Sequence, residues 1–146
     1  MIEMPGFVGN MVRSVGLSTA MKAAGVVTGL LPIPQPLLLV GPGSSKRLGK
    51  ALAGFGHKRI LVVTDETIVQ LGLLKGFTQA LAKAGGEFVV FDDITADAPI
   101  PVVEKAIAFY QRRGCDAIVA FGGGSPMDAA KAIAYCVANR KPPRKL

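Results

Sequence analysis

Four short apolar runs without a polar interruption limit the folds open to this chain more than any other feature of its sequence. They are residues 37–40, 60–63, 88–91 and 117–121. Runs that do not alternate with polar residues are typical of strands covered on both faces by helices. Turn residues and then apolar residues at helical spacing follow each run. These helices are predicted over 44–55, 73–84, 102–113 and 126–138. The sequence therefore predicts an α/β fold with a doubly wound, mainly parallel sheet and flanking helices.

Prolines and charges divide the chain into three parts. Residues 1–36 are predicted to form a helical segment and a proline-rich linker, and the prolines exclude a membrane-spanning helix there. Residues 37–139 hold the predicted Rossmann-like domain, and residues 140–146 form a basic tail that we expect to be solvated. The N-terminal residues do not have the clean apolar run of a secretory signal, so we expect a cytoplasmic protein without a membrane partner.

The composition excludes a disordered chain and argues against a nucleic-acid partner. Half of the 146 residues are hydrophobic and 18% are charged, which is enough apolar material for a buried sheet. The net charge is +7, but no aromatic side chains for base stacking interleave with the densest basic cluster. This cluster is the tail, with Arg140, Lys141, Arg144 and Lys145. We therefore expect no nucleic acid among the partners.

The last apolar run leads directly into Gly122, Gly123, Gly124 and Ser125, and a helix is predicted to follow at once. Glycines let a ligand approach the backbone closely because no Cβ stands in the way. A helix N-terminus presents free N–H groups and a partial positive charge. Ligands of doubly wound sheets also bind at the carboxyl ends of the strands. This turn is therefore a candidate site for a phosphate or pyrophosphate group.

This turn and a second strand end each have a purely structural explanation as well. Ser125 with Asp128 three residues later has the pattern of a capping box, with Pro126 at the first helical position. The glycines also lack the Gly-x-Gly-x-x-Gly spacing of the usual dinucleotide fingerprint. Asp65, which ends the second run, could accept hydrogen bonds from an adenosine ribose or could cap the helix that follows it. The motifs alone leave both interpretations open.

Longer stretches of the sequence carry a family resemblance. Residues 122–132, Gly-Gly-Gly-Ser-Pro-Met-Asp-Ala-Ala-Lys-Ala, resemble the glycine-serine signature of iron-dependent (group III) alcohol dehydrogenases. Residues 60–65, Ile-Leu-Val-Val-Thr-Asp, resemble the strand of this family that ends in Thr-Asp. Residues 31–36 and 41–44 resemble the beginning of the domain in some members. The resemblance covers residues 30–139, and the combined pattern is specific.

The resemblance implies an NAD(P)-linked alcohol or aldehyde oxidoreductase of two domains, of which this chain holds the nucleotide-binding one. Asp65 would contact the adenine ribose and favour NAD over NADP, since a carboxylate repels a 2′-phosphate. Asp128 would lie by the cofactor cleft and steady the glycine turn. The pyrophosphate would be held by Gly122, Gly123, Gly124 and Ser125.

Two departures from the family's pattern bear on function. Members carry a Pro-Asn-Pro-Thr or Pro-Asp-Pro-Thr segment beside the cofactor, where this chain has residues 96–99, Ala-Asp-Ala-Pro. Asp97 fits the polar position of that segment, where the resemblance implies a cofactor contact, but the flanking prolines and the Thr are not matched. The family's metal is bound by one Asp and three His of a helical second domain, whereas this chain has a single histidine, His57. We therefore expect no metal ligand and no catalytic residue in this chain. Fe²⁺ would be bound only by a full-length enzyme, and the domain alone would be inactive.

Two other functions fit the same motifs. The chain could be a non-catalytic module that binds phosphate or nucleotides, or a fragment of an enzyme that resembles glycerol dehydrogenase or dehydroquinate synthase. Ser125 after the glycines favours the alcohol dehydrogenase branch. The expected partners are a dinucleotide, a small alcohol or aldehyde, and a second copy of the chain, against which the apolar segment 7–31 could pack.

Overall fold

The computed structural model describes residues 38–145, and the predicted N-terminal segment 1–36 lies outside this range. From Leu39 onward the residues belong to one compact unit. Its strands are β1 (Ile60–Val63), β2 (Phe88–Phe91) and β3 (Ala117–Ala120). Its helices are α3 (Ser44–Ala53), α4 (Glu66–Gln70), α5 (Lys75–Lys83), α6 (Ile100–Arg112) and α7 (Gly124–Asn139), with a 3₁₀ turn η1 (Pro143–Lys145). None of these helices is long and apolar enough to cross a membrane.

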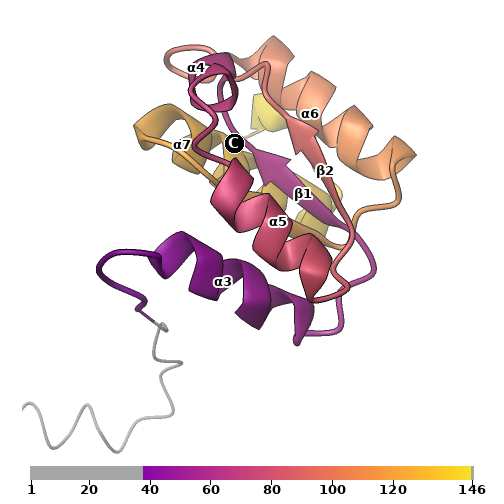
Figure 1. The fold of residues 1–146 in the computed structure, drawn as a ribbon. Coiled ribbons are helices and arrows are strands. Elements are labelled where there is room, and N and C mark those ends of the chain that lie inside the picture. The colour runs from indigo at the N-terminus through magenta and orange to yellow at the C-terminus, as the bar shows by residue number, and fades with distance from the viewer. Residues whose placement is uncertain (1–37, 146) are drawn as a thin grey trace, which may run out of the picture. The chain divides into compact units, whose positions relative to one another are not determined.

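The strands of the described sheet all run parallel, in the order β2-β1-β3. Ile60 of β1 lies level with Phe88 of β2 and with Ala117 of β3, and the register continues to the end of each strand. The chain moves from β1 to β2 through α4 and α5, and then crosses back past β1 to β3 through α6 (Figure 1). This confirms the predicted parallel α/β layer, and it places a topological switch point between β1 and β3.

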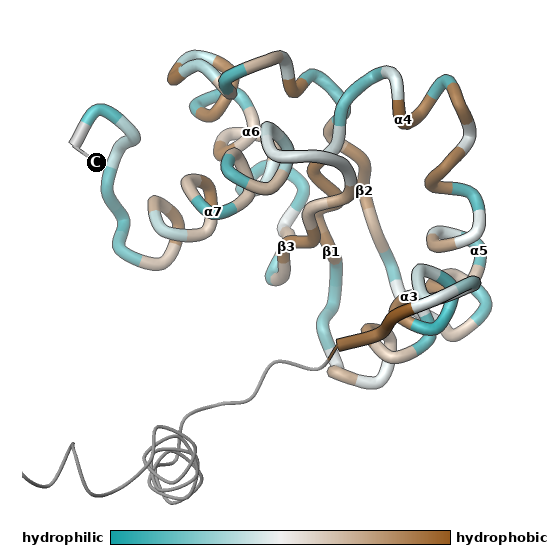
Figure 2. The backbone as a smooth tube through the Cα atoms, turned by 90° about the vertical axis from the view of Figure 1, so that its left-hand side faces the viewer, coloured by the Kyte–Doolittle hydropathy of each residue, from teal (hydrophilic) through white to brown (hydrophobic). Residues whose placement is uncertain are grey.

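β1 is buried along its whole length, and its side chains alternate between two apolar clusters. Leu61 and Val63 pack with residues of α6 and α7. Ile60 and Val62 pack with Phe77 of α5 and with apolar side chains of α3. Figure 2 shows the hydrophobic segments β1 and β3 next to helices of mixed hydropathy. The uninterrupted apolar run is thus explained by a strand that must bury both of its faces.

The strand predicted at 37–40 is wrong over the part that the structure describes, residues 38–40. These residues pair with no strand of the described sheet, and Leu38 and Val40 are 77% and 82% exposed. The Val40 carbonyl accepts a hydrogen bond from Arg47 Nη2 at 2.9 Å, where a strand would use a neighbour's N–H. An apolar run does not become a strand by itself, because it also needs a sheet edge with which to pair.

Two predicted helix boundaries also need correction. The sequence predicts Ser44 or Ser45 as the cap of the helix at 44–55, but the N-cap of α3 is Gly43, whose left-handed backbone (φ 74°) turns the chain into the helix. The helical spacing predicts Phe55 on one face with Leu48 and Leu52, but Phe55 lies beyond the end of α3 and is 61% exposed. α6 begins two residues earlier than predicted, because Pro101 fits the first helical turn, where a backbone N–H has no intrahelical partner.

The basic tail is held against the domain over the residues that the structure describes. Arg140, Lys141 and Arg144 are exposed, as their charges predict. Pro143, however, is buried, and Arg144 Nε lies 3.3 Å from Glu104 Oε1 of α6. The tail therefore forms an ion pair with α6 and buries Pro143 against the domain.

A network of side-chain contacts, here called the clasp, connects the segments at the amino-terminal ends of the strands. Asp116, just before β3, accepts hydrogen bonds from the backbone N–H groups of Lys58 and Arg59 at 2.8 and 3.0 Å. Arg59 in turn pairs with Glu87, just before β2, at 2.7 Å. The Lys58 and Arg59 N–H donors hold the pKa of the Asp116 carboxyl below its ordinary value, because they stabilise its charged form. The clasp links the segments that enter all strands of the described sheet.

We expect Asp116→Asn to lower the thermal midpoint at neutral pH and to reduce the loss of stability in acid. A carboxyl whose pKa is lowered by folding stabilises the protein above its unfolded pKa of about 3.9. This contribution is lost as the pH falls through the lower, folded pKa. Circular dichroism melts at a series of pH values should show the wild type and the variant converging at the acid end. Glu104→Gln, which removes a carboxylate outside the clasp that pairs with Arg144, is the control, and a constant gap at every pH would contradict the assignment.

Helices α3 and α5 cross with almost no space between them at one point. A Cβ built on Gly49 of α3 would lie 2.6 Å from the carbonyl oxygen of Phe77 and 3.1 Å from the backbone nitrogen of Leu81, both on α5. Backbone atoms inside a helix cannot move aside as the end of a flexible side chain can. The contact between α3 and α5 therefore depends on a glycine at this position.

Gly49→Ala is expected to lower the free energy of unfolding by about 1–3 kcal/mol, the usual cost of an overpacked contact. Without the close contact, alanine would stabilise a helix relative to glycine by about 1 kcal/mol. Gly76→Ala on α5 is the matched control, because its Cβ would meet only the flexible Lys46 side chain, with Cε at 3.1 Å. Urea unfolding measures both variants. A Gly49→Ala protein more stable than the wild type would rule out the contact.

Candidate functional site

The carboxyl ends of β1 and β3 lie side by side at the switch point, and the residues that follow them meet there. Asp65 stands two residues after the end of β1, and Gly122 stands two residues after the end of β3. Asp65 also forms an isolated antiparallel bridge with Asp93, which comes shortly after β2. Ligands of doubly wound sheets bind in the crevice at such a reversal. This edge of the sheet is therefore where a site is expected.

Phe121 anchors the start of the glycine loop, residues 122–125, through three contacts. Its backbone N–H donates to the carbonyl of Val63 at 2.9 Å, and its own carbonyl accepts from the buried Thr64 hydroxyl at 2.7 Å. Its ring centroid lies 5.7 Å from that of Phe77 on α5. The glycine loop consequently leaves the sheet from a fixed point.

Helix α7 has Gly123 as its N-cap, so the predicted capping box of Ser125 and Asp128 is wrong. The N–H of Met127 donates to the Gly123 carbonyl at 3.3 Å, and no side chain caps the helix. The helix can begin two residues before Pro126 because the N–H groups of a first turn have no intrahelical partner. The missing N–H of proline therefore costs no hydrogen bond there. Ser125 is therefore a helical residue and not a cap.

The early start of α7 leaves backbone donors open at the glycine loop. Within residues 38–145, no acceptor meets the N–H groups of Gly123, Gly124 or Ser125. Such donors at the positive end of a helix attract anions. The loop therefore has the features of an anion site that is built by the backbone and not by a cationic side chain.

The glycines of the loop differ in what requires them. Gly122 has a φ of 146°, and a Cβ there would lie 2.9 Å from Pro126 Cγ, so both backbone and packing require a glycine. An added Cβ on Gly123 or Gly124, in contrast, would have no atom within 4 Å. Nothing in the described part of the chain explains why these two positions lack a side chain. A ligand lying against the backbone would explain it.

Asp65 caps a helix and still directs an oxygen toward the loop. Its Oδ1 accepts from the N–H of Ile68 at 2.9 Å, which confirms Asp65 as the N-cap of α4. Its Oδ2 lies 3.4 Å from the position that a Cβ would take on Gly122. One carboxylate oxygen is thus used by the fold, and the other faces the crevice.

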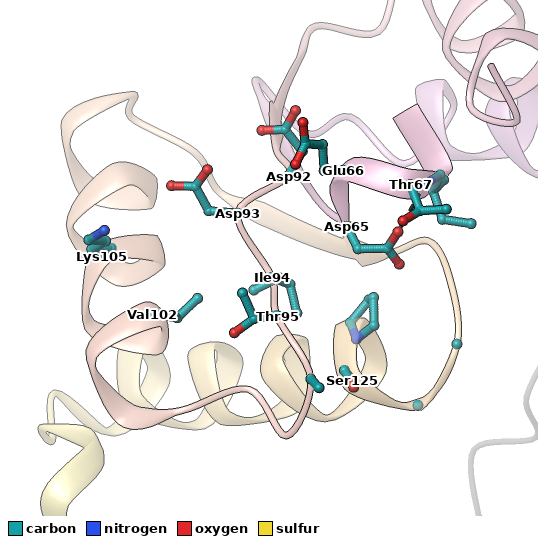
Figure 3. A pocket seen from close by; sticks show the side chains of 15 residues that line it. Asp65, Glu66, Thr67, Asp92, Asp93, Ile94, Thr95, Val102, Lys105 and Ser125 are labelled. Atoms are coloured by element: carbon teal, nitrogen blue, oxygen red, sulfur yellow. Dashed lines mark hydrogen bonds between the residues drawn. The ribbon is translucent and has the colours of Figure 1, made fainter. Parts of the chain in front are cut away.

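A cavity with a volume of about 1120 Å³ lies at these strand ends, which is large enough for a cofactor-sized ligand. Its wall combines the glycine loop with the start of α4, the segment after β2 and one side of α6. Four residues predicted to bind the cofactor line it together: Asp65, Gly123, Gly124 and Ser125. Figure 3 shows how the polar side chains of the wall are spread around it, with Ser125 at the start of α7.

The other residues predicted to bind the cofactor lie outside the cavity wall. Gly122 adjoins the wall as the first residue of the glycine loop. Asp97 is exposed in a turn with a left-handed backbone (φ 59°). Asp128 is exposed on α7, where its Oδ1 lies 3.0 Å from Lys131 Nζ. The structure does not bring Asp97 and Asp128 to the cavity, and their cofactor contacts stay predictions.

Sequence reasoning gave no role to Thr64, Asp92, Asp93 or Lys105, although Thr64 anchors the loop and the others line the cavity. A hydroxyl that closes an apolar run is a signal by which Thr64 could have been found. Asp92 and Asp93 stand at a strand end, where ligand-binding residues are expected. Lys105 lies within α6, where no pattern in the sequence distinguishes it from the other exposed bases.

The described residues do not fit a metal site. Among residues 38–145, no group of three His, Cys, Asp or Glu side chains is placed to hold a metal ion. His57, the chain's single histidine, is exposed before β1, at the opposite edge of the sheet from the cavity.

A parallel α/β layer with a glycine-rich turn at its switch point is an architecture in which ligands bind at the carboxyl ends of the strands. Comparison with known proteins then shows the family. The profile described as "Iron-containing alcohol dehydrogenase" matches residues 36–146. The chain belongs to the iron-containing alcohol dehydrogenase family, which is a family of oxidoreductases.

The related proteins are much longer than the matched region. Choline dehydrogenase of Bacillus subtilis (strain 168) is 37% identical over 93 residues, 64% of this chain and 23% of the relative. NAD-dependent methanol dehydrogenase of Bacillus methanolicus is 33% identical over 104 residues, 71% of this chain and 27% of the relative. A solved structure of 1,3-propanediol oxidoreductase matches at a TM-score of 0.63 and 32% identity, over 66% of this chain and 25% of that one. The chain spans about a quarter of the length of these proteins.

Thr64→Val should lower the free energy of unfolding by about 1–3 kcal/mol, because the Phe121 carbonyl would lose its donor in a buried place. The amide hydrogen of Phe121 should also exchange faster with solvent, since the strand end would lose one of its anchors. Thr64→Ser keeps the hydroxyl and is the control. Urea unfolding and hydrogen exchange measure the two effects, and equal exchange in the valine and serine variants would show that the hydroxyl does not hold the loop.

Proposed function

We propose that this chain binds the pyrophosphate of NAD on the glycine loop, as the cofactor domain of an NAD-dependent alcohol dehydrogenase. The observation that carries the proposal is the pair Gly123 and Gly124, which leaves N–H groups and open space at the positive end of α7. Membership of the family supports it, as does the NAD dependence stated in the name of the related methanol dehydrogenase.

The cavity offers separate places for two parts of the cofactor. The open N–H groups of the loop would donate hydrogen bonds to the phosphates in place of water, without the help of a charged side chain. Asp65 Oδ2 would accept hydrogen bonds from the hydroxyls of the adenosine ribose. A 2′-phosphate at that ribose would meet the same carboxylate, so we propose NAD as the cofactor in preference to NADP.

The reaction proposed for the whole enzyme is hydride transfer between a small alcohol or aldehyde and the nicotinamide ring. The nicotinamide supplies the redox chemistry, and the residues of this chain would bind and orient it. Among the described residues, no group of three His, Cys, Asp or Glu side chains is placed to hold a metal ion. We therefore expect the 146-residue chain to bind the cofactor without turning over an alcohol by itself.

Gly123→Ala and Gly124→Ala test the proposal, because each adds a methyl group where the protein leaves open space. Both variants should be at least as stable as the wild type, and Gly124→Ala could gain up to about 1 kcal/mol because this residue is helical. Binding of ADP-ribose, measured by isothermal titration calorimetry, should weaken at least about tenfold, which is about 1.4 kcal/mol. The reason is that the methyl group would hold the phosphates away from the N–H donors.

Two further variants separate contact with the ligand from damage to the fold. Gly122→Ala should lose stability and binding together, because its Cβ would press on Pro126. Gly76→Ala, which lies on α5 and outside the cavity wall, should lose neither stability nor binding. If the Gly123 and Gly124 variants bind ADP-ribose as tightly as the wild type, the loop is only a helix start and the proposal fails.

A further inference from the structure

The cavity gathers acidic groups in a chain that is basic overall. The chain has ten Asp and Glu residues and a net charge of +7. Four of the ten line this one cavity: Asp65, Glu66, Asp92 and Asp93. Lys105 is the one cationic side chain of the wall, and within the described residues it forms no ion pair with any of them. The wall therefore has the opposite sign to the chain that surrounds it.

The fold itself makes little use of two of these carboxylates. Asp65 caps α4, and Glu66 Oε1 accepts from Gln70 Nε2 at 2.8 Å. The carboxylates of Asp92 and Asp93, by contrast, take part in no hydrogen bond or ion pair within residues 38–145. Helix capping and a side-chain hydrogen bond thus explain the first two acids but not the second two.

Asp92 and Asp93 stand beside the ribose end of the proposed site. The isolated bridge between Asp65 and Asp93 makes their backbones direct neighbours. Figure 3 shows the segment with Asp92 and Asp93 passing between Asp65 and Lys105. Asp93 is exposed and Asp92 is half-buried, so both carboxylates can meet a ligand in the cavity.

We propose that Asp92 and Asp93 are specificity-determining residues, which act together with Asp65 to exclude a dinucleotide that carries a third phosphate. The inference rests on the proposed function, because it concerns which cofactor the same cavity accepts. A ribose hydroxyl can donate to a carboxylate, whereas a 2′-phosphate carries a charge of about −1.5 to −2 and repels it. Repulsions from several carboxylates add. Loss of Asp65 alone therefore leaves much of the discrimination in place.

The experiment compares the affinities of ADP-ribose and 2′-phospho-ADP-ribose for the 146-residue chain at low salt. The variants are Asp65→Asn, the pair Asp92→Asn with Asp93→Asn, and the combination of all three. Glu104→Gln removes one carboxylate of α6 outside the cavity wall and is the matched control for net charge. Asp93→Asn alone is included because Asp93 is exposed, so this variant should fold even if a change at the half-buried Asp92 does not.

We expect the wild type and Glu104→Gln to prefer ADP-ribose by about a hundredfold or more, and Asp65→Asn to keep a preference of at least about tenfold. The triple variant should bind the two probes with affinities within about threefold of each other. The preference of each remaining variant for ADP-ribose should lie between that of the wild type and that of the triple variant. Added salt should narrow the wild-type preference, since it screens charges over about 10 Å at 0.1 M. The same salt should change the triple variant's preference little.

Two results would overturn the inference in distinguishable ways. If Asp65→Asn alone removes the preference, or if variants of Asp92 and Asp93 discriminate as the wild type does, these two residues do not determine specificity while the cofactor site stands. If the wild type binds neither probe, the proposed function fails, and the inference fails with it.

Discussion

The burial of β1 between two layers of helices is the constraint on which the rest of the structure depends. Its four residues are at most 1% exposed, and they supply the centre of both apolar clusters. A sheet covered in this way can present polar groups only at its two ends. At one end, Asp116 accepts hydrogen bonds from backbone N–H groups and Arg59 pairs with Glu87, so the polar groups there are used within the fold. At the other end, donors of the glycine loop stay open, and this is the end at which we propose that the ligand binds.

The parts of the fold that could be predicted are those decided within a few residues of sequence. The strands at 60–63 and 88–91 were predictable because each run must be buried on two faces, and their turns follow at once. The run at 37–40 could not be judged in the same way, because its own composition does not show whether a sheet edge is available. Likewise, the neighbourhood of Asp65 and Asp93 depends on the pairing of β1 with β2, which no local pattern reveals.

The candidate site was predictable in position more than in detail. The glycine loop was found because glycines stood between an apolar strand and a helix, and Asp65 because it ended a strand. The start of α7 was misjudged by two residues, since Ser125 and Asp128 have the composition of a capping box. That difference matters for binding. A serine cap would have accepted a hydrogen bond from the first turn, whereas the observed start leaves those donors open.

The opposite signs of the cavity wall and of the whole chain have a kinetic consequence. As it approaches within about a Debye length of the surface, an anionic dinucleotide meets the field of the basic chain, and an extra phosphate strengthens the attraction. Only inside the cavity would it meet the four carboxylates. A molecule with three phosphates would therefore arrive at least as fast as one with two, and the protein would sort them by how quickly each one leaves. On this view, selectivity would be a matter of residence time.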